Sequence, residues 1–178
     1  MKNIKIKDKE FELFIEAEKI ENSIDRVADR INVDLKDKNP LFIVVLNGAF
    51  MFAADLLKKI VIPCEITFVR LASYQGTEST ESIQEILGLT ESVENRTVVI
   101  VEDIIDTGNT LTTLIEELKK QHPREIKIAT LFLKPGALKY NLHPDYVAME
   151  LPSDFIVGYG LDYDGYGRNL TDIYKLKN

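Results

Sequence analysis

Residues 98–110 read Val98-Val99-Ile100-Val101-Glu102-Asp103-Ile104-Ile105-Asp106-Thr107-Gly108-Asn109-Thr110, and this stretch is the most informative part of the chain. The four apolar, β-branched residues at its start predict a buried strand. Glu102 and Asp103 follow as two adjacent carboxylates at the expected end of that strand. A third carboxylate, Asp106, opens a short loop of small and hydroxyl-bearing residues, and the apolar pattern at 111–115 predicts a helix after it. The stretch therefore predicts a strand, a loop and a helix in succession.

This order of elements suits an anionic ligand, because a loop that leads into a helix directs backbone N–H groups and the positive end of the helix dipole at one point. Gly108 lets the backbone approach a phosphate closely, and Thr107 and Thr110 carry hydroxyl donors. The two acids before the loop suit sugar hydroxyls or a hard metal ion. A strand ending in a polar turn that caps the next helix is the simpler alternative, but capping needs one such residue and not the ordered set. We therefore expect a site for a phosphorylated sugar.

Hydrophobic patterns on both sides of this stretch predict an α/β fold with a mostly parallel sheet. Ile20, Ile24, Val27 and Ile31 fall on one helical face. We expect strands at 11–15, 41–46, 65–71, 98–101, 125–133, 146–149 and 155–158, and helices at about 17–33, 50–59 and 111–120. Ligands of such sheets lie beyond the carboxyl ends of the strands, where the turns after Leu46, Val101 and Leu133 would meet in one site.

Composition narrows the class of protein. A chain of 178 residues with 45% hydrophobic and 29% charged residues favours one globular domain. No apolar stretch has the length of a membrane span, and Met1–Lys7 lacks the apolar core of a signal peptide, so we expect a cytoplasmic protein. Cys64 is the only cysteine, which excludes an internal disulfide and argues against a cysteine-based zinc site. The net charge of −7 argues against nucleic acid as a partner.

The segment Glu102–Thr110 resembles the phosphoribosyl-pyrophosphate signature of the type I phosphoribosyltransferases, in the form found in their hypoxanthine-guanine branch. Asp154–Tyr163 is similar to the purine-binding segment of the same branch, and the resemblance extends over roughly residues 41–170. It implies a type I phosphoribosyltransferase-like, mostly parallel sheet flanked by helices. It also implies one domain over residues 1–178, with a small hood formed by about residues 1–35 and the C-terminal segment.

The resemblance implies roles for the residues of the signature. Glu102 and Asp103 would hold the ribose hydroxyls of phosphoribosyl pyrophosphate, directly or through Mg²⁺. Asp106 would act as the catalytic base that accepts the N7 proton of a purine while N9 attacks the sugar. The residues that would surround the 5′-phosphate are Thr107, Gly108, Asn109 and Thr110.

Further roles follow from the resemblance at other turns. The turn of Asn47 and Gly48, where the family often has a cis peptide, would bind pyrophosphate through backbone N–H groups, although many relatives have lysine in place of Asn47. Arg168 would contact the same pyrophosphate, and Asp162 would hold a second Mg²⁺.

The base would lie among three residues that the resemblance implies for a 6-oxopurine. Lys134 would donate to the 6-oxo group and oppose the 6-amino group of adenine. Phe155 would stack on the base and Ile156 would offer backbone groups to its edge, although Phe155 and Tyr159 without the family would count as core aromatics. Ser73 and Tyr74 resemble the start of a mobile lid over the site, and a polar loop without a role is the alternative there.

The activity implied is purine salvage: transfer of 5-phosphoribose from phosphoribosyl pyrophosphate (PRPP) to N9 of hypoxanthine or guanine, giving IMP or GMP and pyrophosphate. Homodimers or homotetramers are expected by the same resemblance. Transfer to xanthine, adenine or a pyrimidine is one alternative, and a regulator that only senses PRPP is another. A dinucleotide-dependent dehydrogenase is excluded, because no Gly-x-Gly-x-x-Gly follows a strand. His122 and His143 each precede proline, and we assign neither a catalytic role.

Overall fold

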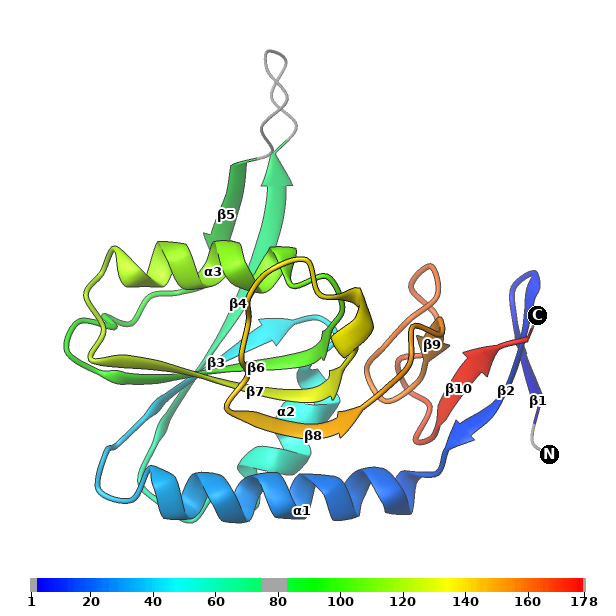
Figure 1. The fold of residues 1–178 in the computed structure, drawn as a ribbon, viewed down its shortest axis with the longest axis horizontal. Helices are drawn as coiled ribbons and strands as arrows, with labels where there is room; N and C mark the ends of the chain where they lie inside the picture. Colours follow the sequence, from blue (N-terminus) through cyan, green and yellow to red (C-terminus); the bar gives the residue numbers. More distant parts are fainter. Residues whose placement is uncertain (1–2, 75–82, 178) are drawn as a thin grey trace.

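The computed structural model describes residues 3–74 and 83–177 and contains two sheets. The large sheet has the strand order β5-β4-β3-β6-β7-β8, and the strands other than β5 run parallel (Figure 1). Its strands are β3 (Leu41–Leu46), β4 (Glu65–Tyr74), β5 (Ile83–Leu87), β6 (Thr97–Ile105), β7 (Glu125–Leu133) and β8 (Tyr146–Glu150). The α/β fold with a mostly parallel sheet that the sequence predicted is confirmed.

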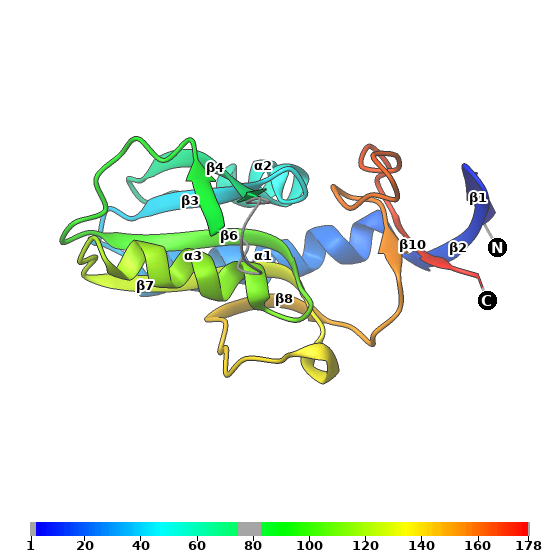
Figure 2. The same cartoon turned by 90° about the horizontal axis from the view of Figure 1, so that it is seen from above.

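Helices cover both faces of the large sheet (Figure 2). Helices α1 (Ala17–Asp34) and α2 (Phe50–Leu57) pack on one face, and α3 (Asn109–Lys119) packs on the other. Because successive side chains of a strand point to opposite faces, β3 supplies Phe42 and Val44 to the α1 side and Leu41 and Ile43 to the α3 side. Burial on both faces explains why the strand sequences are continuously apolar.

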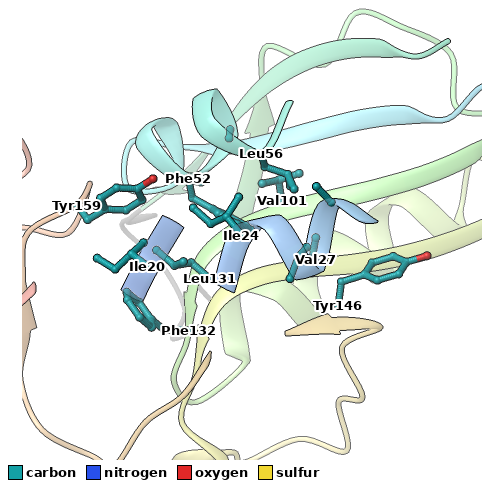
Figure 3. Packing of buried hydrophobic residues seen from close by; sticks show 14 of the residues in the cluster. Ile20, Ile24, Val27, Phe52, Leu56, Val101, Leu131, Phe132, Tyr146 and Tyr159 are labelled. Carbon is teal, nitrogen blue, oxygen red and sulfur yellow. The ribbon is translucent and has the colours of Figure 1, made fainter. Parts of the chain in front are cut away.

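Helix α1 follows its sequence pattern closely. Its buried face consists of Ile20, Ser23, Ile24, Val27, Ala28 and Ile31. Figure 3 shows three of these side chains meeting Phe52 and Leu56 of α2 and residues of β6 and β7. Each fully buried aliphatic or aromatic side chain of this kind contributes about 1.5–3 kcal/mol of transfer free energy. The hydrophobic core that α1 and α2 form with the sheet therefore holds the central strands in place.

The second sheet, which we call the hood, joins the two ends of the chain. Its order is β1-β2-β10-β9, and all its pairings are antiparallel. The strands are β1 (Asn3–Ile6), β2 (Lys9–Ile15), β9 (Ile156–Val157) and β10 (Ile173–Leu176). Both views place it at the end of the large sheet toward which β3 and β6 run. The hood expected from the terminal segments is present, but its N-terminal part ends at Ile15, because α1 packs on the large sheet.

Strand β6 differs from its prediction. The sequence placed the end of this strand at Val101, with two acids after it, whereas the strand continues to Ile105 and contains both acids. Its pairing with β7 continues through Glu102↔Thr130 to Ile105↔Leu133, which keeps the backbone extended past the charged residues. Strands β1, β5 and β10 were not predicted, and a short 3-10 helix (Pro135–Ala137) follows β7. In the parts of the chain that the structure describes, no helix has the length and apolar character needed to cross a membrane.

Candidate active site

The carboxyl ends of β3, β6 and β7 lie side by side, because β6 pairs with both other strands. The turn after β3 contains Asn47 and Gly48, the loop after β6 begins at Asp106, and Lys134 follows β7 directly. The backbone N–H of Lys134 donates to the carbonyl of Ile105 over 3.0 Å, which ties the last two of these segments together. The structure thus brings these sequence-predicted positions to one edge of the sheet.

Glu102 and Asp103 form a buried acidic pair in β6, with only 8% and 9% of their surfaces exposed. Glu102 accepts from the backbone N–H of Asp103 over 3.2 Å, and Asp103 accepts from that of Ile104 over 2.8 Å. Burial raises the pKa of Glu102 well above its usual range, and the neighbouring Asp103 charge adds to this effect. Burial also raises the pKa of Asp103, against hydrogen bonds that stabilise its charged form. Two buried carboxylates are therefore held in an environment that disfavours their charge.

The acidic pair has the chemistry of a magnesium site. In residues 3–74 and 83–177, neither carboxylate has an ion pair within 4.0 Å. A divalent cation would relieve the burial penalty that raises both pKa values. No group of three or more potential ligand residues occurs in the described chain, which is compatible with Mg²⁺, since this ion is often held by one or two carboxylates with water and substrate phosphates.

The turn after β3 lies directly against this pair. Its Leu46–Asn47 peptide bond is cis, as the resemblance implied for this position. A Cβ atom at Gly48 would overlap the Asp103 carboxylate, so only glycine permits this approach. The backbone of the turn and the acid of β6 are consequently parts of one compact site.

The loop between β6 and α3 has the form expected of a phosphate-binding loop. Gly108 is the N-cap of α3 and adopts a φ of 83°, and the helix begins at Asn109, two residues before the predicted start. The amides of the first helical turn have no partner within the helix and point out of its N-terminus. The Asn109 side chain accepts a hydrogen bond from the Tyr140 hydroxyl over 3.0 Å. Its backbone N–H donates to the Thr107 hydroxyl oxygen over 3.4 Å, so both groups of Asn109 have partners within the loop and its surroundings.

Asp106 and Lys134 form an ion pair that sequence analysis did not predict. Lys134 Nζ lies 3.0 Å from Asp106 Oδ2. Lys134 is 7% exposed, whereas half of the Asp106 side chain is accessible to solvent. A lysine at the end of a strand is usually solvated, but here the side chain is buried, and the chain turns at once into the 3-10 helix, whose Ala137 N–H donates to the Lys134 carbonyl over 3.1 Å. The predicted base and the predicted purine-binding cation therefore meet in the ligand-free chain.

Arg168 and Asp162 form a second unpredicted pair on the hood side. Their side chains lie 2.7 Å apart, and Arg168 Nη1 donates to the carbonyl of Gly160 over 2.7 Å. Asp162 also accepts from the backbone N–H of Gly165 over 2.7 Å. The Arg168 charge is close enough to Asp103 to oppose the rise in its pKa. Arg168 is thus placed between the carboxylate expected to hold a second Mg²⁺ and the acidic pair of β6.

Phe155 and Ile156 lie in the hood with opposite exposure. The Phe155 ring is 46% exposed and packs at its edges against Phe11 and Tyr163, with ring centroids 6.4 and 6.0 Å away. Ile156 is buried in β9, where its backbone lies opposite Lys175 of β10. An aromatic ring that remains half exposed on a packed support is available for stacking, whereas Tyr159 of the same segment is a core residue.

Ser73 and Tyr74 are the last residues of β4 and pair with Gln84 and Ile83 of β5. The rest of the predicted lid, 75–82, lies outside the described residues. His122 and His143 line a cavity of about 610 Å³ near the amino end of β7, at the opposite end of the strand from the candidate site.

The chain is similar in sequence and in fold to known proteins. Residues 15–164 match the phosphoribosyl transferase domain family. The chain is 39% identical over 166 residues to a hypoxanthine-guanine phosphoribosyltransferase of Staphylococcus epidermidis, covering 93% of both chains. It is 41% identical over 153 residues to the Streptococcus pyogenes protein of the same name, covering 85% of both. A crystal structure of a hypoxanthine phosphoribosyltransferase from Staphylococcus aureus superposes with a TM-score of 0.86 at 36% identity, covering 93% of this chain and 91% of that one.

Proposed function

The chain belongs to the phosphoribosyl transferase family, and from that premise we propose that it transfers 5-phosphoribose from PRPP to N9 of hypoxanthine or guanine. The products are IMP or GMP and pyrophosphate, which is a purine salvage reaction. The observation that carries this proposal is the edge of the large sheet where a buried acidic pair, a helix N-terminus and the Asp106–Lys134 pair meet. Relatives that are named for this activity match the chain over most of its length.

The sugar phosphate is bound by the β6–α3 segment. The backbone N–H groups of residues 107–110 and the hydroxyls of Thr107 and Thr110 hold the 5′-phosphate at the α3 N-terminus. Glu102 and Asp103 orient the ribose hydroxyls from the strand below. Glu102 and Asp103 would hold Mg²⁺, which would supply positive charge to stabilise the departing pyrophosphate. Asp162 is the residue we assign to a second Mg²⁺, which requires its carboxylate to leave Arg168.

The purine is selected and activated by the Asp106–Lys134 pair. When a 6-oxopurine enters, its oxo group accepts from the Lys134 ammonium, and the Asp106 carboxylate is released to accept the N7 proton. The negative charge of Asp106 also stabilises the cationic character that develops on the ribose. Phe155 stacks on the base and the Ile156 backbone contacts its edge.

Pyrophosphate is held on the other side of the sugar. The backbone of Asn47 and Gly48 donates to it, and Arg168 contributes a charge-assisted hydrogen bond. Asn47 acts through its backbone N–H and not through its side chain. Pyrophosphate binding at this turn therefore does not need the lysine that many relatives have at this position. We assign Ser73 and Tyr74, the last residues of β4, to the lid role that the resemblance implies, which would keep water from the cationic sugar.

We also propose a homodimer or homotetramer of single-domain chains in the cytoplasm. Ile156, Tyr159 and Leu161 join the same core as α1 and the large sheet, which supports one domain. The large apolar side chains of Ile66 and Phe68 are exposed on one face of β4. Such a strip suits contact with a second copy.

A pyrophosphate-release assay tests the proposed function. The protein is mixed with PRPP, Mg²⁺ and one base at a time: hypoxanthine, guanine, xanthine, adenine or uracil. Release with hypoxanthine or guanine, abolished by a chelator, is the expected result. Release with another base alone keeps the transferase but contradicts the roles of Lys134 and Phe155. Silence with every base, together with measurable PRPP binding, would contradict catalysis and favour a sensor.

A further inference from the structure

A hydrogen bond between the hood segment and α2 plays no part in the mechanism above. The Tyr159 hydroxyl donates to Asp55 Oδ2, across 104 positions of sequence. Tyr159 comes two residues after β9, and Asp55 lies in α2. Lys58 Nζ lies 2.7 Å from Asp55 Oδ1 and completes the surroundings of this carboxylate. The bond therefore joins two parts of the chain that lie far apart in the sequence.

The Tyr159 ring is set firmly into the core. It is 5% exposed and belongs to the same cluster as Ile20 of α1 and Phe52 of α2. Figure 3 shows the ring at the edge of this cluster, with its hydroxyl directed toward α2. Its backbone φ is 47°, in a left-handed region that residues other than glycine rarely adopt. A tyrosine persists there only where its surroundings hold it in place.

The segment held by Tyr159 touches the pyrophosphate turn directly. A Cβ atom at Gly160 would overlap the carbonyl oxygen of Gly48, so two backbones are in contact at this point. The N–H of Gly160 donates to the Arg168 carbonyl over 2.9 Å, and its own carbonyl accepts from the Arg168 guanidinium over 2.7 Å. Gly160 is therefore the place where the turn after β3 and the Arg168–Asp162 pair meet.

Asp55 is connected rigidly to that same turn. Helix α2 begins at Phe50, and the Ala53 N–H donates to the Ala49 carbonyl over 2.8 Å, so the turn of Asn47 and Gly48 leads into the helix without a flexible linker. A change in the distance between Tyr159 and α2 would consequently move Gly160 relative to Gly48. The two groups that would hold pyrophosphate, the turn and Arg168, would move apart with it.

The protonation states suit this bond at neutral pH. Burial, followed by the Asp55 carboxylate, raises the pKa of Tyr159 far above its ordinary value, so the hydroxyl keeps its proton. Burial acts to raise the pKa of Asp55, but hydrogen bonds from Lys58 and Tyr159 outweigh it and leave the pKa below the usual value. A neutral donor meets a charged acceptor, which makes a strong hydrogen bond.

We propose that Tyr159 and Asp55 are a positioning pair that sets the spacing between the Gly48 turn and Arg168, and thereby the affinity for PRPP and pyrophosphate. Neither side chain contacts substrate, and the inference rests on the proposed function. The pair acts on the pyrophosphate end of the site. At the purine end, Lys134 and Asp106 follow β7 and β6, and Ile156 is held by its pairing with Lys175 of β10, so we expect this end to change little.

Tyr159→Phe is the first test, because it removes the hydroxyl and keeps the ring. We expect the KM for PRPP to rise about tenfold, which corresponds to ~1.4 kcal/mol. The KM for hypoxanthine should change less than about twofold, since that change corresponds to only a few tenths of a kcal/mol. Tyr174→Phe is the matched control, because Tyr174 is also buried and its hydroxyl lies 3.4 Å from the Asp172 carboxylate, but both partners belong to the hood segment.

Variants of Asp55 separate this bond from general packing. Asp55→Asn retains an oxygen that accepts from Tyr159 and should restore a KM for PRPP near the wild-type value. Asp55→Ala should reproduce the effect of Tyr159→Phe, and the double variant should be no worse than either single one, because both remove the same interaction.

The outcomes distinguish this inference from the proposed function. An active wild type whose KM values do not change in Tyr159→Phe, or rise equally for both substrates, overturns the positioning role. A wild type that is silent with every base contradicts the proposed function instead. Amide hydrogen exchange then tests whether the Tyr159–Asp55 bond holds the two segments in position. Faster exchange at residues 47–49 and 158–162 in Tyr159→Phe, but not in Tyr174→Phe, supports the positioning role. Unchanged exchange overturns it.

Discussion

Replacing Glu102 by glutamine should stabilise the protein at neutral pH, although most substitutions of buried residues lower the free energy of unfolding. Glu102 lies in the middle of the sheet with 8% of its surface exposed, beside a second buried acid. Burial and the Asp103 charge raise its pKa well above the usual range. Glutamine has the same shape without the charge, and its amide can donate to the Asp103 carboxylate. The variant therefore removes a charge penalty and keeps the packing.

The magnitude follows from the cost of an uncompensated buried polar group, roughly 1–3 kcal/mol. Unfolded glutamate titrates near pH ~4.3, and the folded pKa is higher, so the folded state binds more protons than the unfolded state between the two values. The wild type should lose more stability than the variant as pH rises, because the variant keeps only Asp103 of the two buried acids. For a chain of this size ~1 kcal/mol shifts the Tm by about 2–4 °C, which predicts a variant that melts roughly 2–12 °C higher at pH ~8.

Thermal unfolding of both proteins from acid to mildly alkaline pH measures this difference. The two Tm values should converge at acid pH, where both side chains are neutral, and separate as pH rises. Mg²⁺ should raise the Tm of the wild type more than that of the variant, because we propose that the folded acidic pair holds this ion. Glu150→Gln, at an exposed position at the end of β8, is the control and should show no such divergence.

A variant that melts at or below the wild-type temperature at pH ~8 would refute the reasoning, because it would mean that the Glu102 charge is compensated in the folded protein. Equal stabilisation of both proteins by Mg²⁺ would place the ion elsewhere than at this pair.

Three further predictions address the base, the purine and the core. Asp106→Asn should lower kcat far more than it raises either KM, because the lost interaction belongs to the transition state; steady-state kinetics with weaker binding and intact kcat would contradict this role. Lys134→Ala should increase the use of adenine relative to hypoxanthine on the order of tenfold in competition assays, since the cation that opposes a 6-amino group is gone. An unchanged ratio would contradict the role of Lys134 as the donor to the 6-oxo group. Phe52→Ala should lower the free energy of unfolding by about 3–5 kcal/mol in denaturant titrations, because this ring is fully buried between α1 and the sheet. A loss below ~1 kcal/mol would contradict this prediction and show that neighbouring side chains fill the cavity.

Local pattern accounted for most of the large sheet and its helices. The predicted strands 41–46 and 125–133 agree with β3 and β7 residue by residue, and α1 extends one residue beyond its expected end. These elements are long, and their apolar periodicity is strong, so local sequence is sufficient. Strand β6 was placed too short because its last residues include charges, and charged residues ordinarily mark a strand's end. Here the neighbouring β7 continues to supply hydrogen bonds beyond that point.

The hood was poorly visible in the sequence itself. Strands β1, β9 and β10 have two to four residues each, and β10 reaches its partner β2 from the opposite end of the chain. Short strands show little hydrophobic periodicity, and the pairing of two distant segments leaves no pattern among neighbouring residues. Only the family resemblance indicated that the two terminal segments meet.

Neighbouring residues alone specify which chemical groups are present and in what local order: a strand, two acids after its apolar run, a third acid, and a loop that leads into a helix. This holds because strand and helix periods, and the glycine before α3, are properties of neighbouring residues. Which of the distant polar groups meet depends on the tertiary structure. The Asp106–Lys134 and Asp55–Tyr159 contacts depend on how the strands, the hood and α2 pack on one another, since their partners lie 28 and 104 residues apart and no local pattern joins them.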